Sequence, residues 1–474
     1  MSESRAWLAL VLGSLGAACT VQEPTGPTAD ESATSSDDVG VDSSSDSDGS
    51  SSESDSTGGE SCQELTEADA DSPAQIRSCE PHEQDPQLGA DQIDALAAGQ
   101  LALALELYHV LGNGSAQDQS FTISPSSLQV AFGMLYAGTV EPARSELETT
   151  LHFSLGDEQQ HVAFNWLEAQ LVGRSLPTSD DADAVIVAPV NRAWVEQDIV
   201  AGLESNYLDL LSIHYDTGMF LGDFIGQPGA ERDNINGWVA AQTNDLIPEL
   251  FAADDITDKT RFVLVNALYL AAPWASPFDS DDTQKDSFTR LDGTLVEVDM
   301  MYNPHMSARL DAGADWESVT LPLRGEQLAL TVIVPSDFAA FEAGVDAETL
   351  AAILAGPEEQ WWDSIELSLP RFELESTHRL DGPLMQLGMV APFVDEGSFT
   401  DIVDIGLVVR PVVQQTVLKV DEGGVEAAAA TGIVGTRPPS IPPSFRVDRP
   451  FLLAIHDMPT NALLFFGRVL EPQG

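Results

Sequence analysis

The chain has 474 residues, and 43% of them are hydrophobic, which is enough to bury a large core. Its formal charge is −57, from 77 acidic against 20 basic residues, so the chain offers no basic surface to nucleic acid or to an anionic membrane. Length alone would suggest about three domains.

Residues 1–18 have the pattern of a lipoprotein signal peptide. Arg5 precedes an apolar run, Ala6–Ala18, that is too short to span a bilayer. The sequence Leu-Gly-Ala-Ala-Cys that ends at Cys19 resembles a bacterial lipoprotein cleavage box, although Gly16 stands where that box has an aliphatic residue. We therefore predict an exported protein, in the cell envelope or outside the cell, with Cys19 as a lipidated N-terminus and its only membrane contact. Ordinary secretion is the alternative.

Residues 19–61 are predicted to form a disordered acidic tether. From Pro24 to Ser61 the chain is Ser, Asp, Glu, Thr and Gly with almost no apolar residue, and no Lys or Arg occurs between Arg5 and Arg77. Such a segment cannot bury enough surface to offset its ordering entropy, and its like charges repel one another.

Residues 62–87 are predicted to be a short connector that contains the two remaining cysteines. Cys62 and Cys79 have sixteen residues between them. In an exported chain the natural prediction is a disulfide, which for a loop this short is worth about 3 kcal/mol. Metal binding by two lone cysteines is the weaker alternative.

Hydrophobic periodicity predicts a mixed α/β architecture downstream. The helix predicted over Asp91–Leu111 has its apolar residues on one stripe (Ile93, Leu96, Leu103, Leu107 and Val110). A second, largely apolar helix is predicted over Ser127–Ala137. Strands are predicted over Arg261–Leu270, Leu328–Pro335 and Val408–Val420, and then over two apolar runs on either side of a turn at Met458–Thr460, namely Phe445–Ile455 and Asn461–Val469.

The segment Glu422–Thr431 reads Glu-Gly-Gly-Val-Glu-Ala-Ala-Ala-Ala-Thr, and two structures compete for it. On propensity alone it is a short helix that ends at a glycine. Taken with a period of two, it is a strand with a small, apolar face and an opposite, more polar face. The first face holds Val425, Ala427, Ala429 and Thr431, and the second holds Gly424, Glu426, Ala428 and Ala430. The pair Gly423 and Gly424 would supply a hinge.

This segment, the proline-rich stretch after it and the two final strands together resemble the C-terminal quarter of the serpins. Further matching motifs follow one another in order along residues 88–474: Phe121–Leu128, Ile235–Val239, Thr243–Leu250, Leu264–Leu270 with Trp274 and Phe278, Leu369–Phe372, and Leu387–Met389. The resemblance implies one α+β domain over 88–474 rather than three domains. It also implies a large central β-sheet, further sheets, surrounding helices, an exposed reactive loop, and a strand-forming hinge in place of a helix.

The resemblance implies a suicide-substrate inhibitor of a serine or cysteine protease, acting as a monomer without a cofactor. In that family the target attacks the exposed loop and forms an acyl-enzyme, after which the cleaved loop inserts into the main sheet and carries the protease with it. The strong negative charge argues against a heparin-like polyanion as partner. The runner-up is a non-inhibitory serpin that acts as a binding or structural module; such members usually have bulky, charged or proline residues in the hinge.

Site residues carried over from the resemblance fall into two groups. The hinge is Glu422–Thr431. The region where the sheet opens matches Ser124, Ser127, Asn266 and Gln414, with Trp274 at its top; capping, a buried polar network or core packing would explain these residues equally well. Three departures stand out: Val425 replaces the usual Thr or Ser, Leu270–Pro273 replaces an aromatic-Lys-Gly segment, and Gln414 replaces a histidine, so a pH switch through that residue is absent.

The scissile bond is not settled by the sequence. Counting forward from Gly424 by the usual loop length gives Pro438–Pro439, and counting back from the segment after the cut gives Pro439–Ser440. Arg437 is a bait for trypsin-like enzymes, but the proline after it obstructs them. An enzyme that tolerates proline, or an elastase- or subtilisin-like enzyme that cuts near Val434 or Thr436, remains open.

Enzyme function is not supported. The chain has no Gly-x-Ser-x-Gly elbow, His-Glu-x-x-His, Cys-x-x-Cys or dinucleotide glycine fingerprint. Acidic clusters at Asp180–Asp183 and Asp279–Asp282 lack the glycine and terminal glutamate of a calcium loop, so they are interpreted as solvated surface.

Overall fold

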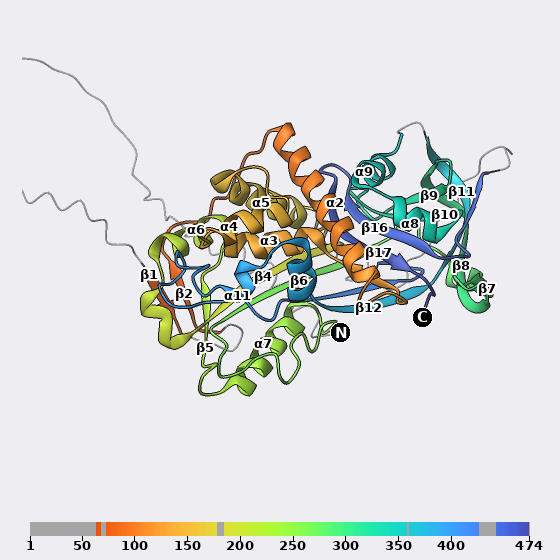
Figure 1. Cartoon of the computed structure of the whole chain (residues 1–474). Helices are drawn as coiled ribbons and strands as arrows, with labels where there is room; N and C mark the ends of the chain where they lie inside the picture. The colour runs from red at the N-terminus through yellow and green to blue at the C-terminus, as the bar shows by residue number, and fades with distance from the viewer. Residues whose placement is uncertain (1–62, 68–72, 178–183, 358–359, 426–441, 474) are drawn as a thin grey trace, which may run out of the picture. The chain divides into compact units, whose positions relative to one another are not determined.

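The computed structural model describes residues 63–67, 73–177, 184–357, 360–425 and 442–473. The strands among these residues form two large β-sheets (Figure 1). The eight-stranded sheet, here called the central sheet, has the order β1 (Gln63–Thr66), β2 (Gln75–Ser78), β5 (Met219–Gly222), β4 (Ile186–Glu196), β6 (Phe262–Pro273), β14 (Gly424–Val425), β13 (Val413–Val420) and β12 (Phe372–Arg379).

The second sheet has nine strands and contains the C-terminal pair. Its order is β15 (Ser444–Arg446), β11 (Trp361–Pro370), β8 (Leu295–Ala312), β9 (Trp316–Pro322), β10 (Leu328–Pro335), β16 (Phe451–Asp457), β17 (Ala462–Val469) and β3 (Phe121–Ile123), with β7 (Gln284–Thr289) paired to β8.

Ten α-helices are found among the described residues: α2 (Ala90–Gly112), α3 (Pro125–Tyr136), α4 (Ala143–Thr150), α5 (Asp157–Val172), α6 (Ser205–Tyr215), α7 (Pro228–Gln242), α8 (Phe338–Gly344), α9 (Ala347–Ala355), α10 (Asp381–Leu387) and α11 (Ala391–Val394). Short 3₁₀ turns occur at η2 (Gln197–Gly202) and η3 (Ser280–Asp282). Helix α2 has the length and hydropathy of a membrane span, but more than half of that window is buried in the domain, as expected of a core helix.

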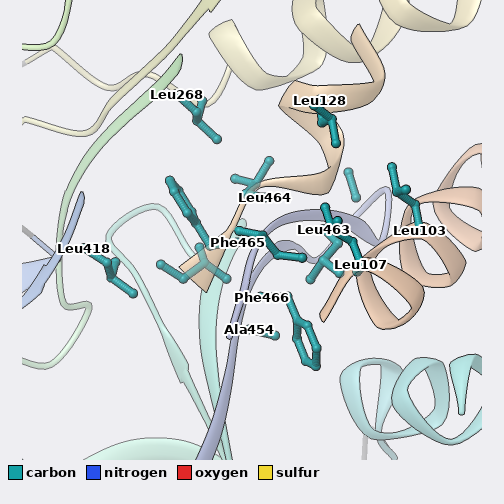
Figure 2. Close-up of a cluster of buried hydrophobic side chains, with 14 of the residues drawn as sticks. Leu103, Leu107, Leu128, Leu268, Leu418, Ala454, Leu463, Leu464, Phe465 and Phe466 are labelled. Atoms are coloured by element: carbon teal, nitrogen blue, oxygen red, sulfur yellow. The ribbon is translucent and has the colours of Figure 1, made fainter. Parts of the chain in front are cut away.

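All twelve residues of β6 are buried, because side chains cover both faces of this central strand. Its alternate residues, including Leu264 and Leu268, enter the large core, while Val263 and Val265 enter a smaller core formed with α7. Figure 2 shows the large core where the sheets meet the helices: Leu268 and Leu418 come from the central sheet, Leu103, Leu107 and Leu128 from α2 and α3, and Leu463–Phe466 from β17.

Most predicted elements are present, with shifted ends. The mixed α and β architecture is confirmed, and the two predicted helices correspond to α2 and α3. The strand predicted over Val408–Val420 begins only at Val413, since Pro411 has no N–H to donate to a neighbouring strand. The run Phe445–Ile455 is divided into β15 and β16 around Pro450.

Residues 62–87 are more than the predicted connector. They contribute β1 and β2, which extend the central sheet beyond β5, and the compact unit begins at Ser61 rather than at residue 88. These strands were missed because four residues are too few for a clear alternating pattern, and because β2 joins the sheet through β5, about 140 residues later in the chain.

Candidate functional site between β6 and β13

The hinge enters the central sheet as the two-residue strand β14. Val425 is paired with Val420 of β13 on one side and with Ala272 of β6 on the other, and its side chain is 1% exposed. A Cβ at position 424 would lie 2.4 Å from the carbonyl oxygen of Ala272, so only glycine fits there. Val425 therefore lies in the large core as a strand residue, and the positions after it lie outside the described residues.

Below β14, the two strands that flank it contact each other directly. Gln414 Nε2 of β13 donates to Asn266 Oδ1 of β6 at 3.3 Å and to the Ser124 carbonyl oxygen at 2.9 Å. The Ser124 N–H donates back to Gln414 Oε1 at 3.0 Å, and Asn266 Nδ2 donates to Asn191 Oδ1 and to the Ser127 carbonyl oxygen. We call these five residues, all buried, the closure network. A longer strand β14 would have to pass between β6 and β13 at this point, where the closure network now joins them.

More polar groups continue the closure network under β12 and β13. The Thr122 carbonyl oxygen accepts hydrogen bonds from Thr416 Oγ1 and from His378 Nε2, each at 3.1 Å. His378 lies directly opposite Gln414 in the register of β12 and β13, and burial lowers its pKa despite the bond to Thr122. The sequence has Gln414 where many serpins have a histidine, and His378 supplies a histidine on the neighbouring strand β12.

Trp274 holds the base of the hinge at the end of β6. Its indole Nε1 donates to the Asp421 carbonyl oxygen and its backbone N–H donates to the Gly423 carbonyl oxygen, both at 2.9 Å. The Phe278 N–H donates to the Glu422 carbonyl oxygen at 3.0 Å. The backbone of Asp421–Gly423 is thus fixed just before the chain enters the sheet.

Glu422 adds an ionic contact to this base. Its carboxylate accepts a hydrogen bond from Thr283 Oγ1 at 2.6 Å and forms an ion pair with Arg371. Burial opposes ionisation of this carboxyl, but the Thr283 hydroxyl and the Arg371 guanidinium outweigh it and hold the pKa of Glu422 below its usual value. The hinge base therefore carries a charge at neutral pH.

Glu422→Gln is expected to lower the free energy of unfolding at pH 7 by about 1–2 kcal/mol, because it removes a charge-assisted contact in a largely buried place. Since the folded-state pKa is lowered, the contribution is present above the unfolded pKa and is lost as pH falls through the folded one. Urea unfolding at pH 7 and at an acidic pH measures this, and the difference from the parent should be smaller at the lower pH. Asp299→Asn, which removes the more exposed ion pair with Lys285, is the control and should cost less. Equal losses at both pH values would contradict the ionic role.

Gln414→Ala is expected to cost about 2–4 kcal/mol of stability, because it removes three buried hydrogen bonds and leaves partners of the closure network unpaired. Gln415→Ala is the matched control: this neighbour makes one side-chain hydrogen bond, to Glu375, and should cost about 1 kcal/mol. Chemical denaturation of both variants checks the difference. Equal effects would mean that the closure network adds no particular stability.

The remaining predicted site positions lie outside the described residues. These are Cys19, Cys62, the hinge positions Glu426–Thr431 and the bait positions Thr436–Ser440. Cys79 takes part in a disulfide. Gln63 pairs with Ser78 in β1 and β2, and the next residues outward in sequence are Cys62 and Cys79, which supports the prediction that these two are joined.

Sequence reasoning missed several partners at this site. Asn191 and Arg192 interrupt the apolar sequence of β4, and that contrast could have marked Asn191. Arg371 belongs to the Leu-Pro-Arg-Phe motif but had no role assigned, and Thr283 carried no signal at all. Both become visible only when the fold brings them to Glu422.

The overall fold is that of known proteins. Uncleaved ovalbumin superimposes with a TM-score of 0.71 at 22% sequence identity, covering 80% of this chain and all of ovalbumin. Native protease nexin-1, solved with heparin, gives a TM-score of 0.68 at 24% identity, with 80% and 100% coverage. These likenesses show the fold.

The sequence comparisons show the family. The model for "Serpin (serine protease inhibitor)" matches residues 98–472, so this chain belongs to the serpin family. A serpin-like protein of Thermococcus kodakarensis is 29% identical over 379 residues, covering 78% of this chain and 84% of that protein. Human serpin B3 is 28% identical over 373 residues, covering 75% and 95%. The predicted family and fold are confirmed. Members of this family are generally protease inhibitors rather than enzymes, and target proteases are their typical partners.

Proposed function

We propose that this serpin is a suicide-substrate inhibitor that traps a serine protease, or a cysteine protease, as an acyl-enzyme. One observation carries the proposal: Gly424–Val425 already forms the first two residues of a strand between β6 and β13. After Glu426 come four alanines, and a period of two would place Ala427 and Ala429 on the face that Val425 buries. After cleavage of the loop, this strand would lengthen and separate β6 from β13 along the whole sheet.

The energies are adequate for such a transition. Insertion breaks the contact between Asn266 and Gln414 and rearranges the closure network, at a cost of about 1 kcal/mol for each hydrogen bond. A dozen new strand residues, at about 1 kcal/mol net each, return roughly 10 kcal/mol before packing. Blocking deacylation needs less, since loss of one oxyanion donor alone slows acyl transfer by about 10²–10³. No catalytic residue of the inhibitor is required.

A non-inhibitory binding module is the competing function. The hinge argues against it, because Ala427–Ala430 lacks the bulky, charged or proline residues that would prevent insertion. The likeness to ovalbumin does not favour it either, since at 22% identity that likeness concerns the fold alone.

Incubation with a panel of proteases tests the proposal directly. Trypsin-, elastase- and subtilisin-like enzymes and a cysteine protease should be compared, and denaturing gels should reveal a covalent complex with at least one of them. Mass spectrometry of the released C-terminal peptide then identifies the scissile bond among Thr436–Ser440 and Val434. Cleavage by every enzyme without any covalent complex would contradict inhibition and favour the binding module.

We also propose that the protein is exported and tethered as a monomer through lipid on Cys19, with the acidic segment 19–61 as spacer. The support is the sequence pattern of residues 1–19. Metabolic labelling with an alkynyl fatty acid should mark the parent protein and not Cys19→Ala. Label on both would contradict the anchor.

A further inference from the structure

The segment Ala74–Glu83, which we call the brace, is built into the edge of the central sheet. It precedes residue 98, where the match to the serpin model begins. Within it, β2 runs antiparallel to β5, with Gln75 opposite Phe220 and Ile76 opposite Met219. The Leu221 N–H also donates to the Ala74 carbonyl oxygen at 2.8 Å. The brace therefore covers a strand that would otherwise form the edge of the sheet.

The body of the domain has a surface shaped for the brace. A Cβ at Gly218 would lie 2.1 Å from the Ile76 carbonyl oxygen, so only glycine permits this approach. The side chain of Ile76 is 7% exposed and belongs to the large core, and Met219 opposite it is fully buried. The contact is thus part of the packed interior and not a loose connection to the tether.

The brace also bonds to two helices beside the sheet. Ser212 Oγ of α6 donates to the Glu80 carbonyl oxygen at 2.6 Å, and the Glu83 N–H donates to the Ile213 carbonyl oxygen at 2.9 Å. Asn165 Nδ2 of α5 donates to the Glu83 carbonyl oxygen at 2.9 Å. One short segment therefore joins β5, α6 and α5.

Arg77 lies at the joint between α6 and β5. Residues 216–218 alone separate the end of that helix from that strand. The guanidinium donates from Nε to Ser212 Oγ at 3.2 Å and forms an ion pair with the Asp216 carboxylate. Because the planar fork of arginine fixes both partners in one geometry, this side chain stiffens the joint.

The joint connects the two halves of the sheet that insertion must separate. Strand β5 pairs with β4, and β4 pairs with β6, so these strands form one half. The start of helix α6 is linked to the other half of the sheet, which contains β13. The Glu204 N–H donates to the Ile402 carbonyl oxygen at 2.9 Å, and Leu203 forms a β-bridge with Val403. Residues 402 and 403 belong to the segment that leads into β13. Movement of β5–β4–β6 away from β13 must therefore bend the joint or break these contacts.

We propose that the brace is a conformational restraint that slows opening of the central sheet and so keeps the uncleaved inhibitor from inserting its own loop. The inference rests on the proposed function, since only a sheet that opens needs such a restraint. The disulfide at Cys79 follows β2 directly, so the oxidised state expected after export would hold the brace in place and reduction would loosen it.

The test measures spontaneous conversion of the intact protein at a temperature just below its unfolding midpoint. Conversion is followed as the appearance of an uncleaved form with raised heat resistance, by native gel and thermal melting. Arg77→Ala should convert about tenfold faster than the parent and Ser212→Ala about threefold faster. Arg290→Ala is the matched control, because its ion pair with Glu471 is similarly exposed but lies far from the joint in the chain, and it should convert at the parent rate.

Two further comparisons separate the possible failures. The double variant Cys62→Ser/Cys79→Ser should convert faster than the parent, as should the parent in reductant, while reductant should not change the double variant. The proposed role of the brace would be overturned if Arg77→Ala converted at the same rate as Arg290→Ala. It would also be overturned if Arg77→Ala lowered the overall stability but left the conversion rate unchanged. If the parent itself never gains heat resistance, even after cleavage of its loop, the proposed function fails instead.

Discussion

Cleavage within residues 426–441 is expected to raise the unfolding midpoint of this serpin by about 10 °C. The inserted segment would add a strand worth roughly 10 kcal/mol, and 1 kcal/mol corresponds to about 1 °C in a domain of roughly 400 residues, because the entropy of unfolding grows with chain length. Calorimetry of the intact protein and of protein cut once in the loop measures the change. Strand spacing supplies a second readout: β6 and β13, now in contact at Asn266 and Gln414, should move to about 9.6 Å apart, which is two strand separations.

A cleaved form that melts at the same temperature as the intact protein would contradict strand insertion. Protein denatured and then cut is the control, since its loop has no folded sheet to enter. A crystal structure of the cut protein in which Asn266 still accepts its hydrogen bond from Gln414 would contradict insertion equally well.

Ala427→Arg is expected to convert the inhibitor into a substrate, so that the protease cuts it and is released active. Val425 is 1% exposed, and in a lengthened strand a period of two would place residue 427 on the same inward face. Burying an unpaired guanidinium costs several kcal/mol, which is enough to delay insertion until deacylation has occurred. The moles of inhibitor consumed for each protease inactivated should rise at least about tenfold, as measured by titration of residual activity.

Ala428→Arg is the matched control for this prediction. The substitution is the same and the position differs by one residue, but a period of two places residue 428 on the outward face. This variant should retain a stoichiometry within about twofold of the parent, because an arginine there can reach solvent. Equal behaviour of the two variants would mean that the segment does not enter the sheet as a strand in this register.

The hinge shows the limit of predicting secondary structure from a local sequence pattern. Propensity favours a helix over Glu-Ala-Ala-Ala-Ala, while the alternation of Val425, Ala427 and Ala429 favours a strand. At Val425 the strand is present, since pairing with Ala272 and Val420 outweighs a preference worth only tenths of a kcal/mol per residue. Such pairing partners cannot be found from the ten residues of the segment alone.

The region where the sheet opens was predictable as a set of residues but not as a network. Ser124, Ser127, Asn266 and Gln414 could be named from motifs. That Gln414 bonds to both Ser124 and Asn266, which lie 290 and 148 residues away in the chain, is a property of the fold. The position of His378 is also a property of the fold, because the pairing of β12 with β13 places this histidine opposite Gln414.

By itself, the amino-acid sequence determined the family, the mixed α and β architecture and the acidic character, because motifs, short-range periodicity and composition encode these features. Only the tertiary structure decided that the sheet is closed below Val425, that Glu422 is held by Arg371 and Thr283, and that residues 74–83 brace the sheet edge. The reason is physical: these features are contacts between segments far apart in the chain, and their energy depends on geometry that no local pattern records.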